Sequence, residues 1–308
     1  MDTQNISQCP EVSVKCFLLS MFHSAIVQQE TLTEIPLNRA KDSARVLYVS
    51  AIALKWAKTW QQTPQAIAAQ LAETLEPLCS PNFAVKAASA GFIELELTDA
   101  GLAFWLQRLA QTKLPVPESR ILSAVVCADR LFPIQYSHAR CCSLLRMAHR
   151  DRLISIAQPD VATAPQIWSL AAPNPIPWLD KGDRLRLVHP AERNLISQLI
   201  AVLDNLAPIF WNCIQHKPVP TQNNIVGTRH CRLLHHSGAT GIDINYLKIA
   251  NSLSAAFQTF YSQCRIWGEV KIETPKLAQA RLGLVLATQS LLRFILEELL
   301  SAVAPLEL

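Results

Sequence analysis

Glycine is scarce in this sequence, with only eight residues among 308. An average protein contains about 7% glycine, more than twice this share. Loops that cradle phosphate groups need glycine, because its missing side chain lets the backbone approach the ligand. Neither G-x-G-x-x-G nor G-x-x-x-x-G-K-[ST] occurs in the chain. We therefore expect no nucleotide-binding domain of either common type.

Long uncharged apolar runs and paired-cysteine motifs are also missing. The most apolar stretch, from Leu282 to Leu300, contains Arg293, Glu297 and Glu298, so we expect no transmembrane helix. The nine cysteines include no C-x-x-C pair, and the first residues lack the basic segment of a signal peptide. We therefore expect a cytoplasmic protein with reduced thiols and no membrane contact.

Catalytic and metal-binding motifs are equally sparse. No G-x-S-x-G or H-E-x-x-H occurs. Two short pairs, Cys213-x-x-His216 and Cys231-x-x-x-His235, have spacings that zinc sites use, but turns do not bracket either pair tightly. We therefore expect no metal and no cofactor. The basic residues around the second pair leave two interpretations open, a phosphate-contacting loop or a solvated loop: Arg229, His230, Arg232, His235 and His236.

Basic residues are concentrated in the second part of the chain. Residues 1–119 carry nine Lys/Arg against eleven Asp/Glu, whereas residues 120–308 carry nineteen against thirteen. A guanidinium group can bind two phosphate oxygens at once, so an arginine-rich surface suits nucleic acid. A solvated basic face would give the same count. Most of the excess lies in nine arginines: Arg130, Arg140, Arg146, Arg150, Arg152, Arg184, Arg186, Arg229 and Arg232.

The first part of the chain, residues 1–112, predicts a small α+β domain. Thr63 and Pro64 combine a cap residue with a proline in the first turn, which indicates a helix start. Between Phe83 and Leu97 the apolar period changes to two, which indicates two antiparallel strands. Helical apolar spacing or capping predicts the other elements, which are helices within residues 1–35, 43–59, 63–76 and 99–112.

The second part, residues 122–308, is predicted to be mostly helical. Residues 113–121 indicate a linker, because Pro115 and Pro117 prevent a regular helix. The helical spacing is clearest over residues 247–264 and 277–299. Two segments are too long for ordinary connections between bundle helices, so we interpret them as insertions: residues 156–190 and 216–243. The expected fold is therefore mainly α, with a small α+β N-terminal domain followed by an α-helical bundle.

Three stretches resemble arginyl-tRNA synthetases. Residues 90–97, AGFIELEL, are similar to the G-P-G-F-I-N-F-x-L strand of the synthetase N-terminal domain. Residues 134–146, IQYSHARCCSLLR, resemble the V-Q-Y-A-H-A-R-I-x-S-I-L-R helix that opens the DALR anticodon-binding domain. Residues 253–266, LSAAFQTFYSQCRI, resemble L-A-x-A-F-N-x-F-Y-x-x-C-R-V, and residues 281–288 follow as A-R-L-x-L-V-x-A-T does in that family. The resemblance implies a helical bundle of the DALR type.

The departure from the family is as informative as the likeness. In the family a Rossmann-type catalytic domain lies between the first and second stretches, but only about 35 residues separate Leu97 from Ile134 here. The signatures H-x-G-H and K-M-S-K, which hold ATP phosphates and stabilise charge in adenylate formation, are absent from the sequence. We therefore expect no aminoacylation and no enzymatic activity.

The resemblance also implies which residues face an RNA ligand. It places Tyr136, His138 and Arg140 on a helix facing the anticodon stem-loop, where an aromatic ring stacks on a base and arginine binds phosphate. It places Arg265 near the anticodon, with Tyr261 one turn away on the same face, and a structural role is the alternative for Tyr261. Packing against neighbouring helices is the alternative role for Tyr136 and His138. The family commonly ends P-E-R-M where this chain has PLEL, so the resemblance does not extend to normal anticodon reading.

The function implied is that of a non-catalytic tRNA-binding protein connected with translation, with arginine tRNA as one candidate ligand and no DNA. The alternative is a protein-interaction or regulatory adaptor module that has lost RNA binding. A linker of about ten residues spans at most roughly 35 Å, which limits how far apart on one tRNA the two modules can bind. The faces that pack on the catalytic domain in the family must be covered by the insertions, by the opposite domain or by a protein partner.

Overall fold

The computed structural model describes residues 13–26, 35–42, 44–111, 114, 128–157, 168–215 and 239–308, with residues 207–215 and 239–245 described as backbone only. Within these ranges, no helix is long and apolar enough to cross a membrane. Of the predicted linker 113–121, only Leu114 is described, so the domain boundaries stay a prediction.

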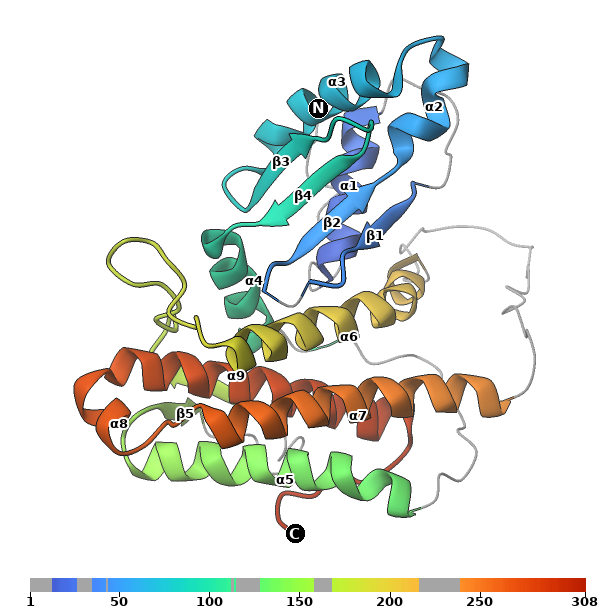
Figure 1. Ribbon diagram of the computed structural model, residues 1–308. Helices are drawn as coiled ribbons and strands as arrows, with labels where there is room; N and C mark the ends of the chain where they lie inside the picture. The colour runs from blue at the N-terminus through green and yellow to red at the C-terminus, as the bar shows by residue number, and fades with distance from the viewer. Residues whose placement is uncertain are drawn as a thin grey trace, which may run out of the picture.

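The first part of the chain is an antiparallel sheet covered by helices. The strand order is β1-β2-β4-β3, and helices α1 and α3 lie behind the sheet in Figure 1. The side chains that point toward these helices, such as those of Tyr48, Ile93 and Leu95, are fully buried. The elements are α1 (Val14–Ile26), β1 (Leu37–Arg39), β2 (Leu47–Ser50), α2 (Ile52–Trp60), α3 (Pro64–Cys79), β3 (Phe83–Ala87), β4 (Ile93–Leu97) and α4 (Asp99–Gln111).

Most of the predicted elements in this part are confirmed. Strands β3 and β4 pair as the period-two pattern predicts, and the Thr63 hydroxyl accepts the N–H of Ala66 at the start of α3. The helix predicted over residues 43–59 is wrong in its first half, because Leu47–Ser50 forms strand β2 between β1 and β4. Alternate side chains of this strand are buried, a pattern that matches a pleated sheet with one covered face.

The second part is a helical bundle, so the predicted mainly α fold class is confirmed. Helices α5, α7 and α9 pack along one another, with α6 between them and the sheet (Figure 1). The predicted insertion 156–190 contributes a strand that pairs with β5, and most of the insertion 216–243 lies outside the described residues. The elements are α5 (Ala128–Arg150), β5 (Ser155–Ala157), β6 (Ser169–Ala172), α6 (Pro190–Gln215), α7 (Ala239–Gln263), α8 (Glu269–Glu273), α9 (Pro275–Phe294) and a π-helical turn (Ile295–Leu299).

The two parts pack directly against each other, with α1 on α6 and α4 on α9 (Figure 1). Asp204 on α6 accepts hydrogen bonds from the hydroxyl of Ser13, the backbone N–H of Lys15 and the hydroxyl of Tyr48, at 3.1, 3.1 and 2.5 Å. Burial raises the pKa of the Asp204 carboxyl, so these donors meet it in a dry environment. This carboxyl is thus the polar centre of the contact between sheet and bundle.

The segment before α6 closes the second side of this contact. Gln107 on α4 accepts hydrogen bonds from the backbone N–H of Ile176 and the indole N–H of Trp178, both at 2.9 Å. The ring of Trp178 lies against Gly283 on α9, where a Cβ atom would come within 2.4 Å of it. Residues of the predicted insertion therefore join α4 to α9, and both the insertion and the opposite domain cover part of the bundle.

Replacing Asp204 with alanine is expected to lower the free energy of unfolding by about 2 kcal/mol or more, because three donors lose their acceptor. Asn205→Ala is the matched control, since that exposed side chain donates only to the Ala201 carbonyl within α6; it should cost less than ~0.5 kcal/mol. Urea unfolding of both variants measures the difference. Equal effects would contradict the assigned role of Asp204.

Candidate nucleic-acid interface

An arginine and a tyrosine from two helices meet on one face of the bundle. Arg140 on α5 donates from Nη2 to the hydroxyl of Tyr261 on α7, and its guanidinium carbon lies 4.6 Å from the centre of the tyrosine ring. The two residues are 121 positions apart in the sequence. Cation–π contact and the hydrogen bond fix the direction of the guanidinium group. Two of the predicted residues, from separate helices, are therefore brought together as one unit.

An exposed aromatic pair lies one turn before this unit. The ring of Tyr136 stacks on that of Phe132 with centroids 6.2 Å apart, and the two residues are 45% and 57% exposed. Large aromatic side chains on a helix surface normally bury more of their area than this. Phe132 was not among the predicted residues, although its position four residues before Tyr136 puts both rings on one face. The pair offers a flat surface on which an unpaired base could stack.

Arg265 lies beyond the end of α7, which ends at Gln263, so the expectation that it shares a helix face with Tyr261 is wrong; its side chain is exposed. Closer to the middle of α7, the Gln258 side chain donates to the Ser137 hydroxyl at 3.0 Å and ties α7 to α5. Tyr136, Arg140 and Tyr261 thus lie on α5 and α7, and Arg265 lies beyond the end of α7.

His138 does not lie on the surface. Its side chain is fully buried, with Nδ1 at 2.9 Å from the carbonyl of Pro305 and Nε2 at 3.0 Å from Nε2 of Gln289. The carbonyl can only accept, so Nδ1 carries the proton and Nε2 accepts from the amide. Desolvation lowers the pKa of His138 to about 4. The direct RNA contact expected of His138 is therefore not part of the candidate interface, because the ring joins α5 to α9 and the C-terminal segment instead.

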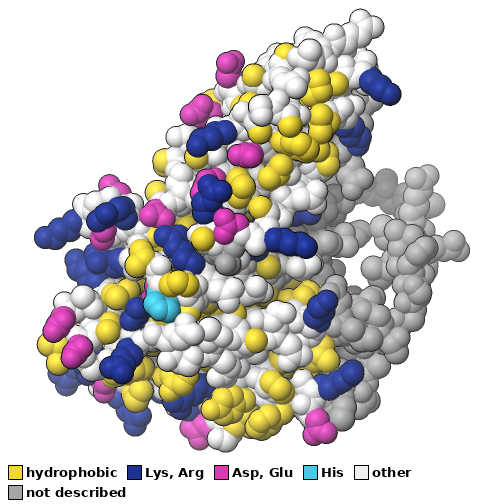
Figure 2. All heavy atoms as spheres, in the orientation of Figure 1, with side chains coloured by type: hydrophobic (Ala, Val, Ile, Leu, Met, Phe, Trp, Pro, Cys, Tyr) yellow, Lys and Arg dark blue, Asp and Glu magenta, His cyan; other side chains and the backbone are white. Residues whose placement is uncertain are grey.

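The charge on this face is available to an anion. In the described part of the chain, neither Arg140 nor Arg265 has a carboxylate within ion-pair distance. The buried Nε–H of Arg140 has no hydrogen-bond acceptor there either. At the end of the bundle where α8 lies, Lys and Arg side chains stand among Asp and Glu side chains (Figure 2). The exposed side chain of Arg265 can donate to an anionic ligand, whereas the Nε–H of Arg140 is buried.

The open face of the sheet has a different character. Glu94 lies opposite Lys86 in the pairing of β3 and β4, and Arg45 forms an ion pair with Glu96 at 3.3 Å. The basic side chains on this face are therefore matched by carboxylates. A row of unpaired arginines that could bind successive phosphates therefore does not continue from the bundle over strands β3 and β4.

Other candidate sites carry less chemistry. Among the described residues no group of three or more His, Cys, Asp or Glu side chains could hold a metal ion, and the predicted Cys/His pairs fall outside the described side chains. The Cys264 thiol lies 3.5 Å from Nδ1 of His189, and desolvation raises the pKa of Cys264 to about 11, which disfavours the thiolate form.

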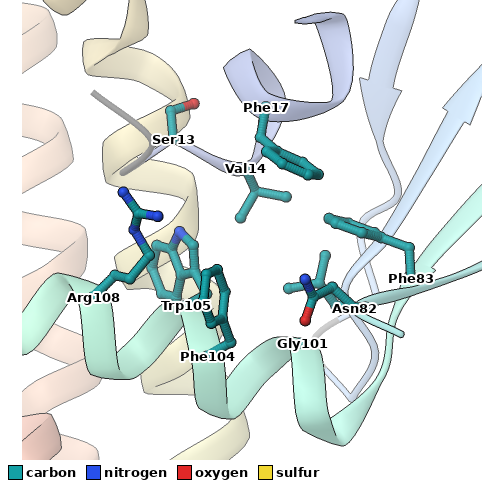
Figure 3. Close-up of a pocket in the computed structure, with 10 residues that line it drawn as sticks. Ser13, Val14, Phe17, Asn82, Phe83, Gly101, Phe104, Trp105 and Arg108 are labelled. Carbon is teal, nitrogen blue, oxygen red and sulfur yellow. The ribbon is translucent and has the colours of Figure 1, made fainter. Parts of the chain in front are cut away.

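A small cavity of about 160 Å³ lies in the first part of the chain, between α1, α4 and the base of β3 (Figure 3). Its walls are mostly apolar, with the stacked rings of Phe17 and Phe83 on one side and Phe104 on the other (Figure 3). Arg108 lies over the Phe104 ring at 5.5 Å from its centre. None of the predicted RNA-facing residues lines this cavity, so it is separate from the interface on α5 and α7.

Comparisons with known proteins agree with the resemblance drawn from the sequence. Residues 13–97 match the family model of the arginyl tRNA synthetase N terminal domain. A curated arginine–tRNA ligase of Synechococcus sp. (strain JA-3-3Ab) is 28% identical over 172 residues, which is 56% of this chain and 21% of that protein. The matched length is about twice that of residues 13–97, so the similarity extends beyond the first domain.

The chain spans about a fifth of the length of this relative. No solved structure matches the chain. The family model covers the sheet with α1 to α3, and the longer alignment requires residues outside that domain as well. Residues 13–97 of this chain are thus similar to the N-terminal domain of arginyl-tRNA synthetases, and a helical bundle follows them.

Proposed function

We propose that this chain binds tRNA through the surface of α5 and α7 and does not aminoacylate it. The observation that carries the proposal is the contact of Arg140 with Tyr261, one turn from the exposed Tyr136, with Arg140 and the exposed Arg265 free of carboxylate partners in the described structure. Arginine suits phosphate, and exposed aromatic rings suit unpaired bases.

The interface chemistry favours RNA over a protein partner. The aromatic pair Phe132 and Tyr136 has Arg140 one turn away, and this combination of rings and a cation suits unpaired bases beside phosphate. The remaining exposed large apolar side chains come from different elements, and single exposed residues of this kind are ordinary on a protein surface. They are Leu54, Leu78, Phe104, Val188, Ile272, Val303 and Leu308.

Three observations support the proposal that the chain is not catalytic. The sequence has neither H-x-G-H nor K-M-S-K, and only about 35 residues connect the two segments that flank a catalytic domain in the family. The two modules pack on each other through α1, α4, α6 and α9, so much of the surface between them is covered. We expect no arginine-dependent exchange of pyrophosphate into ATP, and activity above the protein-free level would contradict this part.

Crosslinking followed by pull-down and sequencing of the bound RNA tests the proposal in a native extract. Enrichment of arginine tRNAs would mean that the specificity of the family persists. Enrichment of many tRNAs would mean that binding depends on shape and that anticodon reading is lost. Recovery of a stable protein without RNA would refute the proposal and favour the adaptor function. The cytoplasm is the compartment in which we expect this binding.

A further inference from the structure

A buried ion pair joins the two helices that flank the end of α7. Nε of Arg281 on α9 lies 2.6 Å from Oε1 of Glu192 in the first turn of α6, and the two side chains are 10% and 1% exposed. Charges so deeply buried are costly unless all their hydrogen-bonding groups are used. The contacts of both groups therefore indicate what the pair does.

Glu192 is held in place by the start of its own helix. Its Oε2 accepts the backbone N–H of His189, the residue that caps α6, at 2.8 Å. The ring of His189 accepts the N–H of Ala191 at 3.2 Å, so the cap is satisfied in both directions. Both carboxylate oxygens of Glu192 are thus occupied, and the carboxylate forms a fixed point for Arg281.

A second nitrogen of the Arg281 guanidinium group binds the backbone of Arg265. Its Nη1 donates to the backbone carbonyl of Arg265, which lies just beyond the last residue of α7. On either side of this carbonyl the chain is buried, at Cys264 and Ile266, while the side chain of Arg265 itself is exposed. The guanidinium group therefore clamps the peptide from which the Arg265 side chain projects.

We infer that Glu192 and Arg281 are positioning residues, which hold the Arg265 side chain on the RNA-facing surface without touching RNA. This inference rests on the proposed function for its consequence, but the clamp on Arg265 can be measured without RNA. Glu192→Gln removes the charge that orients Arg281. Arg281→Lys keeps a positive charge but loses the planar fork that reaches Glu192 and Arg265 together.

Limited trypsin digestion tests the clamp directly, because trypsin cuts at the Arg265 carbonyl that Arg281 binds. We expect cleavage between Arg265 and Ile266 to be slow in the parent chain and roughly tenfold faster in each variant, the size of one lost charged hydrogen bond. Cleavage rates at all other sites report general unfolding and should stay the same. Unchanged cleavage after Arg265, or an equal rise at every site, would overturn the inference.

Binding of tRNA gives the functional readout through a double-mutant cycle. Glu192→Gln should weaken binding roughly tenfold in the parent chain and have no further effect when Arg265 is already alanine. An equal loss in both backgrounds would assign the pair a general structural role and overturn the inference. A parent chain that binds no tRNA would refute the proposed function, while the trypsin result would still decide whether the pair holds Arg265.

Discussion

A variant with alanine at Tyr136, Arg140 and Arg265 is expected to bind tRNA about a hundredfold more weakly than the parent chain. Stacking on one aromatic ring contributes about 1–3 kcal/mol for each base. The two arginines have no carboxylate to neutralise among the described residues, so their loss removes contacts to phosphate. A gel-shift titration at several salt concentrations measures both the affinity and its dependence on salt.

The matched control replaces Arg45, Arg184 and Phe104 with alanine. It removes the same number of cations and one exposed aromatic ring, all outside the surface of α5 and α7. The affinity of the control variant should stay within about threefold of the parent value. The slope of log K against log salt concentration should become shallower only in the first variant, by roughly 0.7 for each lost phosphate contact to single-stranded RNA. Similar losses in both variants would mean that binding depends on net charge and not on this face.

The parent chain is expected to lose stability as the pH falls from 6.5 toward 4 because of His138. Burial lowers the pKa of His138 to about 4, whereas in the unfolded chain it is near 6.5. Between pH 6.5 and pH 4 the unfolded chain therefore binds a proton at His138 that the folded chain does not bind. The free energy of unfolding is thus highest above pH 6.5 and decreases as the pH falls toward 4. The loss from this one group amounts to about 3 kcal/mol, which is a large share of the stability of an ordinary domain.

His138→Gln separates this effect from the titration of carboxylates. The amide can still donate to the Pro305 carbonyl, but it takes up no proton in this range. Unfolding by urea at pH 7 and pH 4.5 should show a smaller loss in the variant than in the parent chain. Parallel losses in the two proteins would contradict the buried neutral state of His138.

Local chemistry made several elements of the fold predictable. Thr63 and Pro64 start α3 as expected, because a cap and a proline act within one turn. Strand β2 was not predicted, because Val46, Tyr48 and Val49 also fit a helix face over such a short stretch. Their strand conformation depends on pairing with β4, whose residues lie more than forty positions away. Sequence periodicity contains no information about a partner at that distance.

The same limit applies to the candidate interface. Resemblance identified Tyr136, Arg140, Tyr261 and Arg265, but only the packing of α5 against α7 brings Arg140 onto the Tyr261 ring. His138 has the same helical spacing as its neighbours, and its burial follows from the way α9 and the C-terminal segment cover that side of α5. Partners that distant in the chain are visible only in the fold.

The polar contacts between the two parts of the chain could not be predicted from the sequence either. Asp204 is one carboxylate among the polar residues of an amphipathic helix, and its donors, Ser13 and Tyr48, lie 191 and 156 positions away. Glu192 gave a better signal, because it stands three residues after the cap of α6, as in a capping box. Its ion pair with Arg281 still required the fold.

The central claim, that this chain binds tRNA through the bundle, is tested most directly by titrating labelled tRNA with the whole chain in the presence of excess fully paired DNA duplex. DNA competes for contacts that depend on charge alone, while unpaired RNA bases remain available to the aromatic face. The account predicts saturable tRNA binding that survives the competitor. Binding that the DNA abolishes, or no binding at physiological salt, would contradict it.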